Sequence, residues 1–144
     1  MSEVGSQNLQ PIRSLDDLRV YRMAMELANE VHDQTLAFPA YARNELGRQM
    51  RLSADSVPAN IAEGYGRSRY AADFKRFLVT ALGSCTELGC QLDLALGYKY
   101  IANEVHQQLQ AKREHLGRSL HVMIKKWQPI AKGSTGGSNR VAWG

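Results

Sequence analysis

A short segment near the middle of the chain, GYGRSR over residues 64–69, combines residue types that bind phosphate. Arg67 and Arg69 can each donate two parallel hydrogen bonds to one phosphate group. Glycines allow a backbone to approach a ligand closely, and the start of a following helix presents free N–H groups to an anion. The neighbouring Tyr65 and Tyr70 can stack on nucleic-acid bases. The segment therefore predicts a phosphate-binding turn, with a plain junction between two helices bearing solvated arginines as the alternative.

Positive charge is concentrated in two blocks of the 144-residue chain, whose net charge is +4. Residues 39–76 carry seven basic and four acidic side chains, and residues 111–144 carry seven and one. The two intervening blocks are net acidic. This alternation suits either a polyanion partner or electrostatic pairing between subunits. The predicted nucleic-acid-binding residues are Arg67, Arg69, Lys75, Arg76, Arg113, Arg118, Lys125 and Lys126.

A second set of polar side chains is spaced to meet across two helices. Ser84, Glu87 and Gln91 share one helix face because they lie three and four positions apart. A helical hairpin closed at the GYGRSR segment places Gln49 level with Ser84, and Arg48 and Arg51 near the Glu87 carboxylate, which needs such a partner if buried. We predict either a polar network that fixes the register between helices or subunits, or an exposed polar stripe. Its members are Gln49, Arg51, Asn60, Glu63, Ser84, Glu87 and Gln91.

Recognised catalytic and metal-binding patterns are absent from the sequence. It contains no H-E-x-x-H, C-x-x-C, Walker or G-x-S-x-G motif, and no histidine lies four positions from another. Cys85 and Cys90 are five positions apart on different faces of an expected helix, which argues against a disulfide between them. We therefore expect no enzymatic activity, no cofactor and no metal site.

The composition indicates one soluble globular domain. Apolar residues make up 44% of the chain and charged residues 22%, and no apolar run reaches the roughly 20 residues of a membrane span. The N-terminal MSEVGSQNLQPIRS lacks the apolar centre of a secretory signal. We expect a cytoplasmic protein without a membrane partner.

Four stretches with helical spacing of apolar residues must position these side chains. We predict helices over about residues 15–36, 42–63, 69–96 and 104–130. Pro58 lies within the second stretch and is expected to bend or interrupt that helix. The third stretch has the most regular spacing, with Phe74, Phe77, Ala81, Cys85, Leu88, Leu92 and Ala95 on one face.

Local signals predict where these helices begin and end. Ser14, Ser68 and Asn103 are the expected N-cap residues, because their side chains can accept hydrogen bonds from free backbone N–H groups. Gly64 and Gly66 are expected to end the second helix.

No segment alternates with period two, so the predicted fold is all-α. We expect an antiparallel up-down four-helix bundle over residues 14–131. A flexible N-terminal segment over residues 1–13 and a flexible Gly/Ser-rich tail over residues 132–144 are expected to flank it.

The combination of these stretches resembles a known protein family. Its two most specific blocks are a Gln-x-Arg…Ser-x-x-x-Asn-Ile-Ala-Glu-Gly run from Gln49 to Gly64 and a Gly-Ser-x-x-Glu-Leu-x-x-Gln-Leu run over residues 83–92. Together with the rest of about residues 15–128, they resemble the four-helix bundle proteins encoded by 23S rRNA intervening sequences. Leu52 departs from the pattern, because the family often has a second arginine there, and this weakens the argument that the second helix binds nucleic acid.

The resemblance implies an antiparallel four-helix bundle that assembles as a ring-shaped homopentamer. A related protein, the accessory variability determinant of diversity-generating retroelements, works with a reverse transcriptase and binds nucleic acid, whereas most family members have no established biochemical function. We predict a non-enzymatic oligomeric bundle that binds nucleic acid, with RNA favoured, through basic surface patches. The alternative is a structural or adaptor protein that recruits a protein partner through the oligomer surface without nucleic-acid contact.

Overall fold

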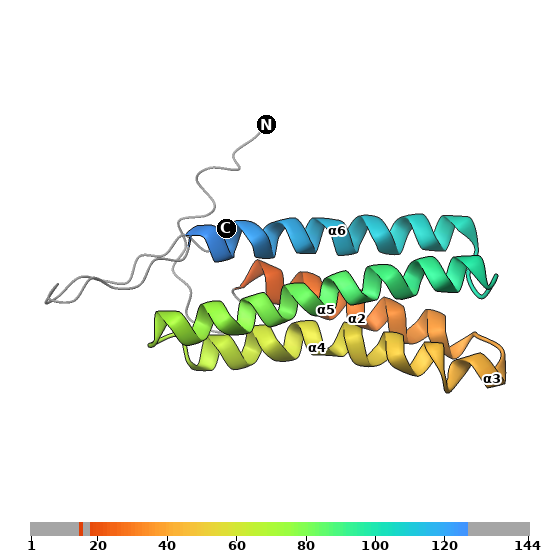
Figure 1. Ribbon diagram of the computed structural model, residues 1–144, viewed down its shortest axis with the longest axis horizontal. Helices are drawn as coiled ribbons and strands as arrows, with labels where there is room; N and C mark the ends of the chain where they lie inside the picture. The colour runs from red at the N-terminus through yellow and green to blue at the C-terminus, as the bar shows by residue number, and fades with distance from the viewer. Residues whose placement is uncertain (1–14, 16–17, 127–144) are drawn as a thin grey trace, which may run out of the picture.

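The computed structural model describes residue 15 and residues 18–126 of the chain. Its helices are α2 (Arg19–Leu36), α3 (Ala40–Arg43), α4 (Leu46–Gly66), α5 (Ala71–Gly97) and α6 (Asn103–Lys126). The four long helices run antiparallel to their neighbours in the chain, and α2 and α6 also contact each other, which closes the bundle (Figure 1). No strand occurs in this described part of the chain, so the predicted all-α four-helix bundle is confirmed.

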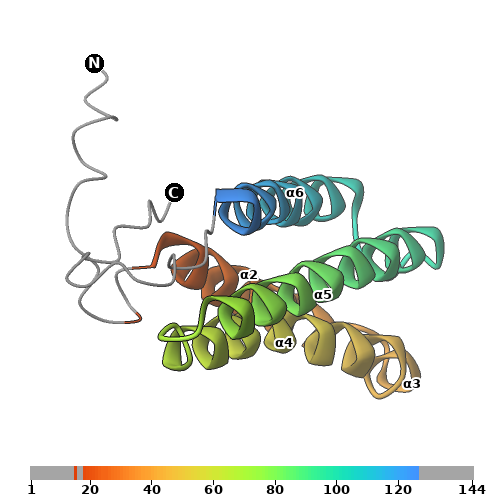
Figure 2. The ribbon, with the colours of Figure 1, turned by 60° about the vertical axis from the view of Figure 1, so that its left-hand side comes forward.

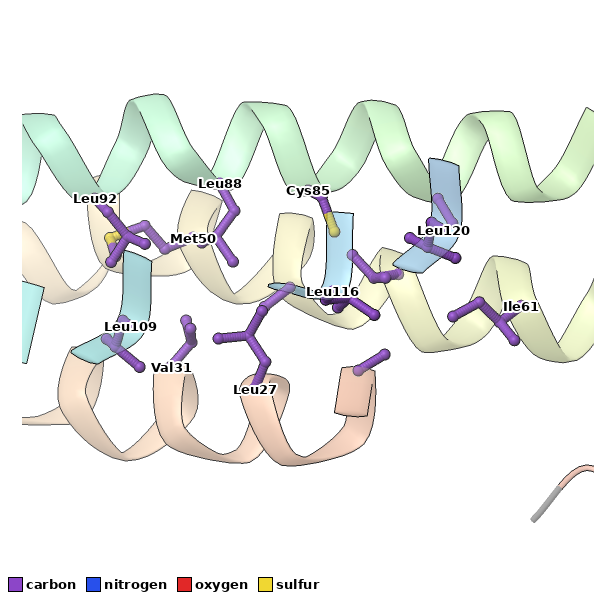
Figure 3. Close-up of a cluster of buried hydrophobic side chains, with 14 of the residues drawn as sticks. Leu27, Val31, Met50, Ile61, Cys85, Leu88, Leu92, Leu109, Leu116 and Leu120 are labelled. Carbon is purple, nitrogen blue, oxygen red and sulfur yellow. The ribbon is translucent and has the colours of Figure 1, made fainter. Parts of the chain in front are cut away.

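One apolar core lies along the axis of the bundle. All four long helices contribute side chains to it, and those labelled in Figure 3 are Leu27, Val31, Met50, Ile61, Cys85, Leu88, Leu92, Leu109, Leu116 and Leu120. The predicted face of α5 is buried from Phe74 to Ala95 except at Phe77, which is partly exposed. Each fully buried large apolar side chain stabilises the fold by about 1.5–3 kcal/mol relative to its exposure to water.

The second predicted helix is divided into a single turn, α3, and the long α4. Arg51 on α4 donates a hydrogen bond of 3.1 Å to the carbonyl of Arg43, at the end of α3, and one of 2.9 Å to Thr35 Oγ1 at the end of α2. The first bond satisfies a backbone carbonyl that the end of α3 leaves free, and the second ties α4 to a side chain of α2. Further along, α4 continues through Pro58, so the helix is not interrupted at the proline.

The prediction that Gly64 and Gly66 end the second helix is confirmed at Gly66, the last residue of α4, and is wrong at Gly64. Gly64 lies inside the last turn of α4 and is buried against α5. A Cβ atom on Gly64 would lie only 2.9 Å from Cβ of Phe77. The absence of a side chain at Gly64 therefore allows α4 and α5 to approach each other closely.

The predicted helix starts are met in part. α5 begins after Tyr70, whose side chain makes no capping hydrogen bond, so Ser68 is not the N-cap. α6 begins at Asn103 itself, one residue before the predicted start. Ser14, the terminal segments 1–13 and 132–144 and the part of the last helix beyond residue 126 lie outside the described residues.

Candidate nucleic-acid interface

The α4–α5 turn lies at one end of the bundle. Backbone hydrogen bonds of 2.9–3.1 Å close it over residues 67–70. Figures 1 and 2 show that α2 begins and α6 ends toward this same end. Residues 63–77 with Lys125 and Lys126 are called the basic end below.

Two arginines of the basic end lie against one aromatic ring. Cζ of Arg67 is 5.4 Å from the centroid of the Phe77 ring, and Cζ of Arg76 is 4.7 Å from it. At these distances the ring quadrupole attracts both guanidinium groups. The two side chains remain 52% and 63% exposed, so the N–H groups that no carboxylate occupies are accessible to a ligand.

Each of these arginines has a carboxylate neighbour. Arg67 Nε lies 3.0 Å from Oε1 of Glu63, and Arg76 Nη2 lies 3.8 Å from Oδ1 of Asp73. All four side chains are substantially exposed, so water screens both pairs and each contributes little to stability.

Arg69 and Lys75 complete the predicted cluster. Both side chains are exposed, and neither makes a hydrogen bond or ion pair with the described part of the chain. Tyr70, which follows Arg69 in the turn, is 62% exposed. The basic end thus presents two paired and two unpaired cations around the α4–α5 turn, beside an exposed aromatic ring.

The predicted basic residues of the last helix do not form one patch. Arg118, Lys125 and Lys126 are exposed, and the two lysines occupy the last turn of α6, where the helix dipole favours cations. The Arg113 side chain is only 18% exposed and covers Gly89 of α5, where an added Cβ would lie 2.7 Å from Arg113 Cζ. Arg113 therefore packs between two helices, away from the exposed cations.

A polar network between α5 and α6 was not predicted from the sequence. His106 Nε2 lies 2.8 Å from Asp93 Oδ1, and Gln110 Nε2 donates to the same oxygen and to the carbonyl of Gly89, each at 2.9 Å. The hydrogen bonds from His106 and then Gln110 lower the pKa of Asp93. Arg113 Nε donates to Gln110 Oε1 at 2.6 Å. The available signal was Gly89, which leaves room for a large side chain from the next helix.

Part of the predicted polar network joins α4 and α5 within one chain. Ser53 Oγ donates to Oε1 of Glu87 at 2.5 Å, and the hydroxyl oxygens of Ser56 and Ser84 are 2.8 Å apart. Asn60 Nδ2 donates to Ser56 Oγ at 3.0 Å. This arrangement fixes the register of the two helices inside a subunit. Ser53 and Ser56 were missed as members of the network.

The predicted register of this helix pair is wrong by about two turns. Ser84 meets Ser56 rather than Gln49, seven positions earlier in α4, because α4 extends to Gly66 and the turn follows that residue. Arg51 is accordingly not the partner of Glu87 and instead ties α4 to α2 and α3, as described above.

The remaining predicted members lie apart from the network. Gln49 is exposed, and Glu63 pairs with Arg67 at the basic end. Gln91 is 7% exposed, and its Oε1 has no hydrogen-bond partner in the described structure.

Other titratable groups serve the packing of the helices. Lys112 Nζ lies 2.6 Å from Glu30 Oε1 and 2.9 Å from Glu26 Oε1, which links α6 to α2 and raises the pKa of Lys112. Burial raises the pKa of Cys85 to about 11. Within residues 15 and 18–126, no three His, Cys, Asp or Glu side chains are grouped as metal ligands, and no helix is long and apolar enough to cross a membrane.

Aromatic side chains gather at the opposite end of the bundle. The Tyr100 ring centroid lies 5.3 Å from that of Phe38, 6.1 Å from that of Tyr41 and 5.6 Å from that of Tyr98. Tyr41 and Tyr98 are 68% and 57% exposed. Between the two tyrosines of the α5–α6 connection, Lys99 has a φ of 65°, in the left-handed region. These five residues are called the tyrosine end below.

The described part of the bundle has a groove of mixed polarity and an uncharged stripe on its surface. The groove, of about 450 Å³, lies between α2 and α4 and is lined by Tyr21, Met25, Ala28, Asn29, His32, Asp55, Pro58, Ala59 and Ala62. The stripe consists of exposed, uncharged residues along α5, namely Val79, Gly83, Thr86, Cys90 and Leu94.

Comparison with known proteins identifies the family. Residues 16–122 match the model of the 23S rRNA-intervening sequence protein family, so the chain belongs to that family and the resemblance noted in the sequence is confirmed. The fold is similar to a crystal structure of a protein of unknown function from the S23 ribosomal protein family of Bacteroides thetaiotaomicron, with a TM-score of 0.65, 24% identity and coverage of 74% of this chain and 98% of that one. No curated protein gives a significant match.

Proposed function

We propose that this family member is a non-enzymatic helical bundle that binds nucleic acid, with RNA favoured, through its basic end. The observation that carries the proposal is the cluster of exposed cations at the α4–α5 turn, formed by Arg67, Arg69, Lys75 and Arg76. Phe77 holds two of these guanidinium groups at one place while leaving their N–H groups accessible. Clustered arginines of this kind suit the bidentate recognition of phosphate.

The end of α6 adds to the positive charge of the same end. Lys125 and Lys126 are exposed in its last described turn, and Arg118 is exposed about two turns earlier on the same helix. Cations spread over several elements suit the extended backbone of a nucleic acid better than a single small anion.

We also propose that the chain assembles as a homopentamer, as the family resemblance implies. The groove between α2 and α4 and the uncharged stripe on α5 support this assembly, because a head-to-tail ring requires two different surfaces on each subunit. A ring would repeat the basic end around its axis. Several weak sites on one particle would then bind one long nucleic acid much more tightly than a single site does.

Fluorescence anisotropy of labelled single-stranded RNA and DNA, titrated with protein at several salt concentrations, tests the proposal. The variant is Arg67→Ala/Arg69→Ala, and the control is Arg43→Ala/Lys99→Ala, which removes two exposed cations from the opposite end. We expect the first variant to bind about tenfold more weakly and the slope of log K against log salt to fall by about 1.5. The control should bind like the wild type.

Two results would contradict the proposal. One is an unchanged salt slope in Arg67→Ala/Arg69→Ala, which would exclude the turn as the phosphate site. The other is no binding of either nucleic acid at low salt, which would exclude nucleic-acid binding by this chain.

The alternative function is that of an adaptor that recruits a protein partner without nucleic acid. The tyrosine end favours it, because Tyr41 and Tyr98 are largely exposed and exposed tyrosines are enriched in protein interfaces. A partner captured by the wild type and lost by Tyr41→Ala/Tyr98→Ala, together with no binding of nucleic acid, would establish the adaptor instead.

A further inference from the structure

The two arginines that lie against Phe77 already have anionic neighbours. Glu63 Oε1 accepts a 3.0 Å hydrogen bond from Nε of Arg67, which lies four positions further along the chain, directly after the end of α4. Asp73 lies farther from its partner, at 3.8 Å from Arg76 Nη2. Of the two carboxylates, Glu63 is therefore the one in hydrogen-bonding contact with a cation of the proposed site.

The position of the Glu63 carboxylate determines which N–H groups of Arg67 are available to a ligand. Phe77 attracts the guanidinium group of Arg67 at a distance of 5.4 Å, so the N–H edges of that group remain as its binding surface. A carboxylate and a phosphate bind a guanidinium group through the same N–H edges. A phosphate that binds Arg67 through Nε must therefore displace the Glu63 carboxylate.

We propose that Glu63 is a built-in competitor of nucleic-acid phosphate at Arg67 and sets the affinity of the basic end. The proposal rests on the proposed function and names a residue that regulates the same site. Both partners of the ion pair are about half exposed, so the pair is weak and a ligand phosphate can replace it. Breaking the Glu63–Arg67 pair lowers the affinity of a ligand with one phosphate more than that of a polyanion. The other phosphates of a polyanion can bind the unpaired Arg69 and Lys75.

Asp73 is the less suitable residue for a test of this kind. It lies in the first turn of α5, where a carboxylate also stabilises the helix through its dipole. Its replacement would change helix stability and binding together. Glu63 lies near the end of α4, where a negative charge is disfavoured by the dipole, so its neutralisation does not weaken the helix.

The test is Glu63→Gln, which keeps the size of the side chain and removes its charge. Binding of a labelled single-stranded oligouridine is measured by anisotropy at several salt concentrations. We expect Glu63→Gln to bind about two- to fivefold more tightly than the wild type, the factor that corresponds to the strength of an exposed ion pair. In the Arg67→Ala background the same substitution should change affinity little, because the guanidinium group for which Glu63 and phosphate compete has been removed.

Glu104→Gln is the matched control. It raises the net charge by the same amount, and Glu104 is exposed and makes no ion pair in the described structure. Glu104 also lies in a first helical turn, that of α6, but this turn is toward the tyrosine end, so a change in helix stability there does not act at the basic end. Its affinity should equal that of the wild type. Circular dichroism of each variant checks that the helices are retained.

The possible outcomes separate this inference from the proposed function. The competition is supported if Glu63→Gln raises the affinity for RNA more than Glu104→Gln does, and if this increase is absent in the Arg67→Ala background. A wild type that binds, with Glu63→Gln equal to Glu104→Gln or weaker than the wild type, overturns the competition while nucleic-acid binding stands. No binding by the wild type or by Glu63→Gln at low salt overturns both.

Discussion

The two ends of the bundle differ in how their exposed side chains are held in place. At the basic end, Arg67 and Arg76 are held by a shared ring and by exposed carboxylates. At the tyrosine end, the rings of Tyr41 and Tyr98 pack against Tyr100, which packs in turn against the buried Phe38. One end therefore relies on interactions that salt and ligands weaken, and the other on apolar contacts that they leave intact.

This difference teaches where stability and binding should reside in the molecule. Exposed ion pairs contribute about 0–1 kcal/mol, so the basic end can exchange its internal partners for a ligand with little loss of stability. Aromatic contacts contribute more and do not depend on salt. Substitutions at the tyrosine end should thus act on the free energy of unfolding, and substitutions of the basic side chains should act on binding.

The largest effect is expected for Tyr100→Ala at the tyrosine end. The Tyr100 ring contacts three other aromatic rings and is partly buried against the core, so its removal should lower the free energy of unfolding by about 2–3 kcal/mol. Urea denaturation followed by circular dichroism measures the change. Affinity for RNA should remain that of the wild type where the variant is folded. Weaker RNA binding by the folded variant would contradict the claim that the tyrosine end affects stability and not binding.

A smaller effect is expected for Gly64→Ala, which should lower both the free energy of unfolding and the affinity for RNA. The added Cβ would lie 2.9 Å from Phe77 Cβ, so α4 and α5 must separate. We expect a loss of about 1–2 kcal/mol, since overpacking outweighs the better helix propensity of alanine, and a measurable loss of RNA affinity as the ring shifts from the two arginines.

Gly66→Ala is the matched control for that substitution, because no atom lies within 4 Å of the Cβ that it adds. It should leave both stability and binding close to those of the wild type. Equal destabilisation by the two substitutions would show that the close approach of α4 and α5 at Gly64 is not the cause.

The smallest effect, of opposite sign, is expected for Lys99→Gly. Lys99 has a φ of 65° at the end of α5, where the Tyr100 N–H bonds to the Ala95 carbonyl at 2.8 Å. Glycine adopts this conformation without strain, so the substitution should raise the free energy of unfolding by about 0.5–1 kcal/mol. Lys99→Ala keeps the strain and removes the same charge, and it should not stabilise the protein in the same thermal or urea titration.

The sequence predicted the helices well, because burial of one face imposes the spacing of residues such as Leu88 and Leu92 wherever a helix lies in the bundle. It predicted the register of α4 and α5 poorly. The two glycines of the GYGRSR segment indicate a helix end by propensity, whereas Gly64 is required inside α4 by the neighbouring Phe77. Because the turn was predicted too early in the chain, Ser84 was placed opposite Gln49 instead of Ser56.

The candidate site was predicted in part for a related reason. Charge alone singled out Arg113 together with Arg118, yet only the structure shows that Arg113 is packed over Gly89. The tyrosine end was not predicted, because Phe38 and Tyr100 are brought together only by the tertiary fold. Local spacing thus indicated which residues are buried, whereas the contacts of long side chains between helices depend on how the helices pack in three dimensions.

The measurement that tests the central claim most directly is ultraviolet crosslinking of the wild-type protein to single-stranded RNA, followed by mass spectrometry of the crosslinked peptides. Both ends of the bundle carry aromatic side chains, so either end can report contact. Binding at the basic end predicts crosslinks in peptides that contain Tyr65, Tyr70 or Phe77, which are lost as salt is raised. Crosslinks at Tyr41, Tyr98 or Tyr100, or none at either end, would contradict it.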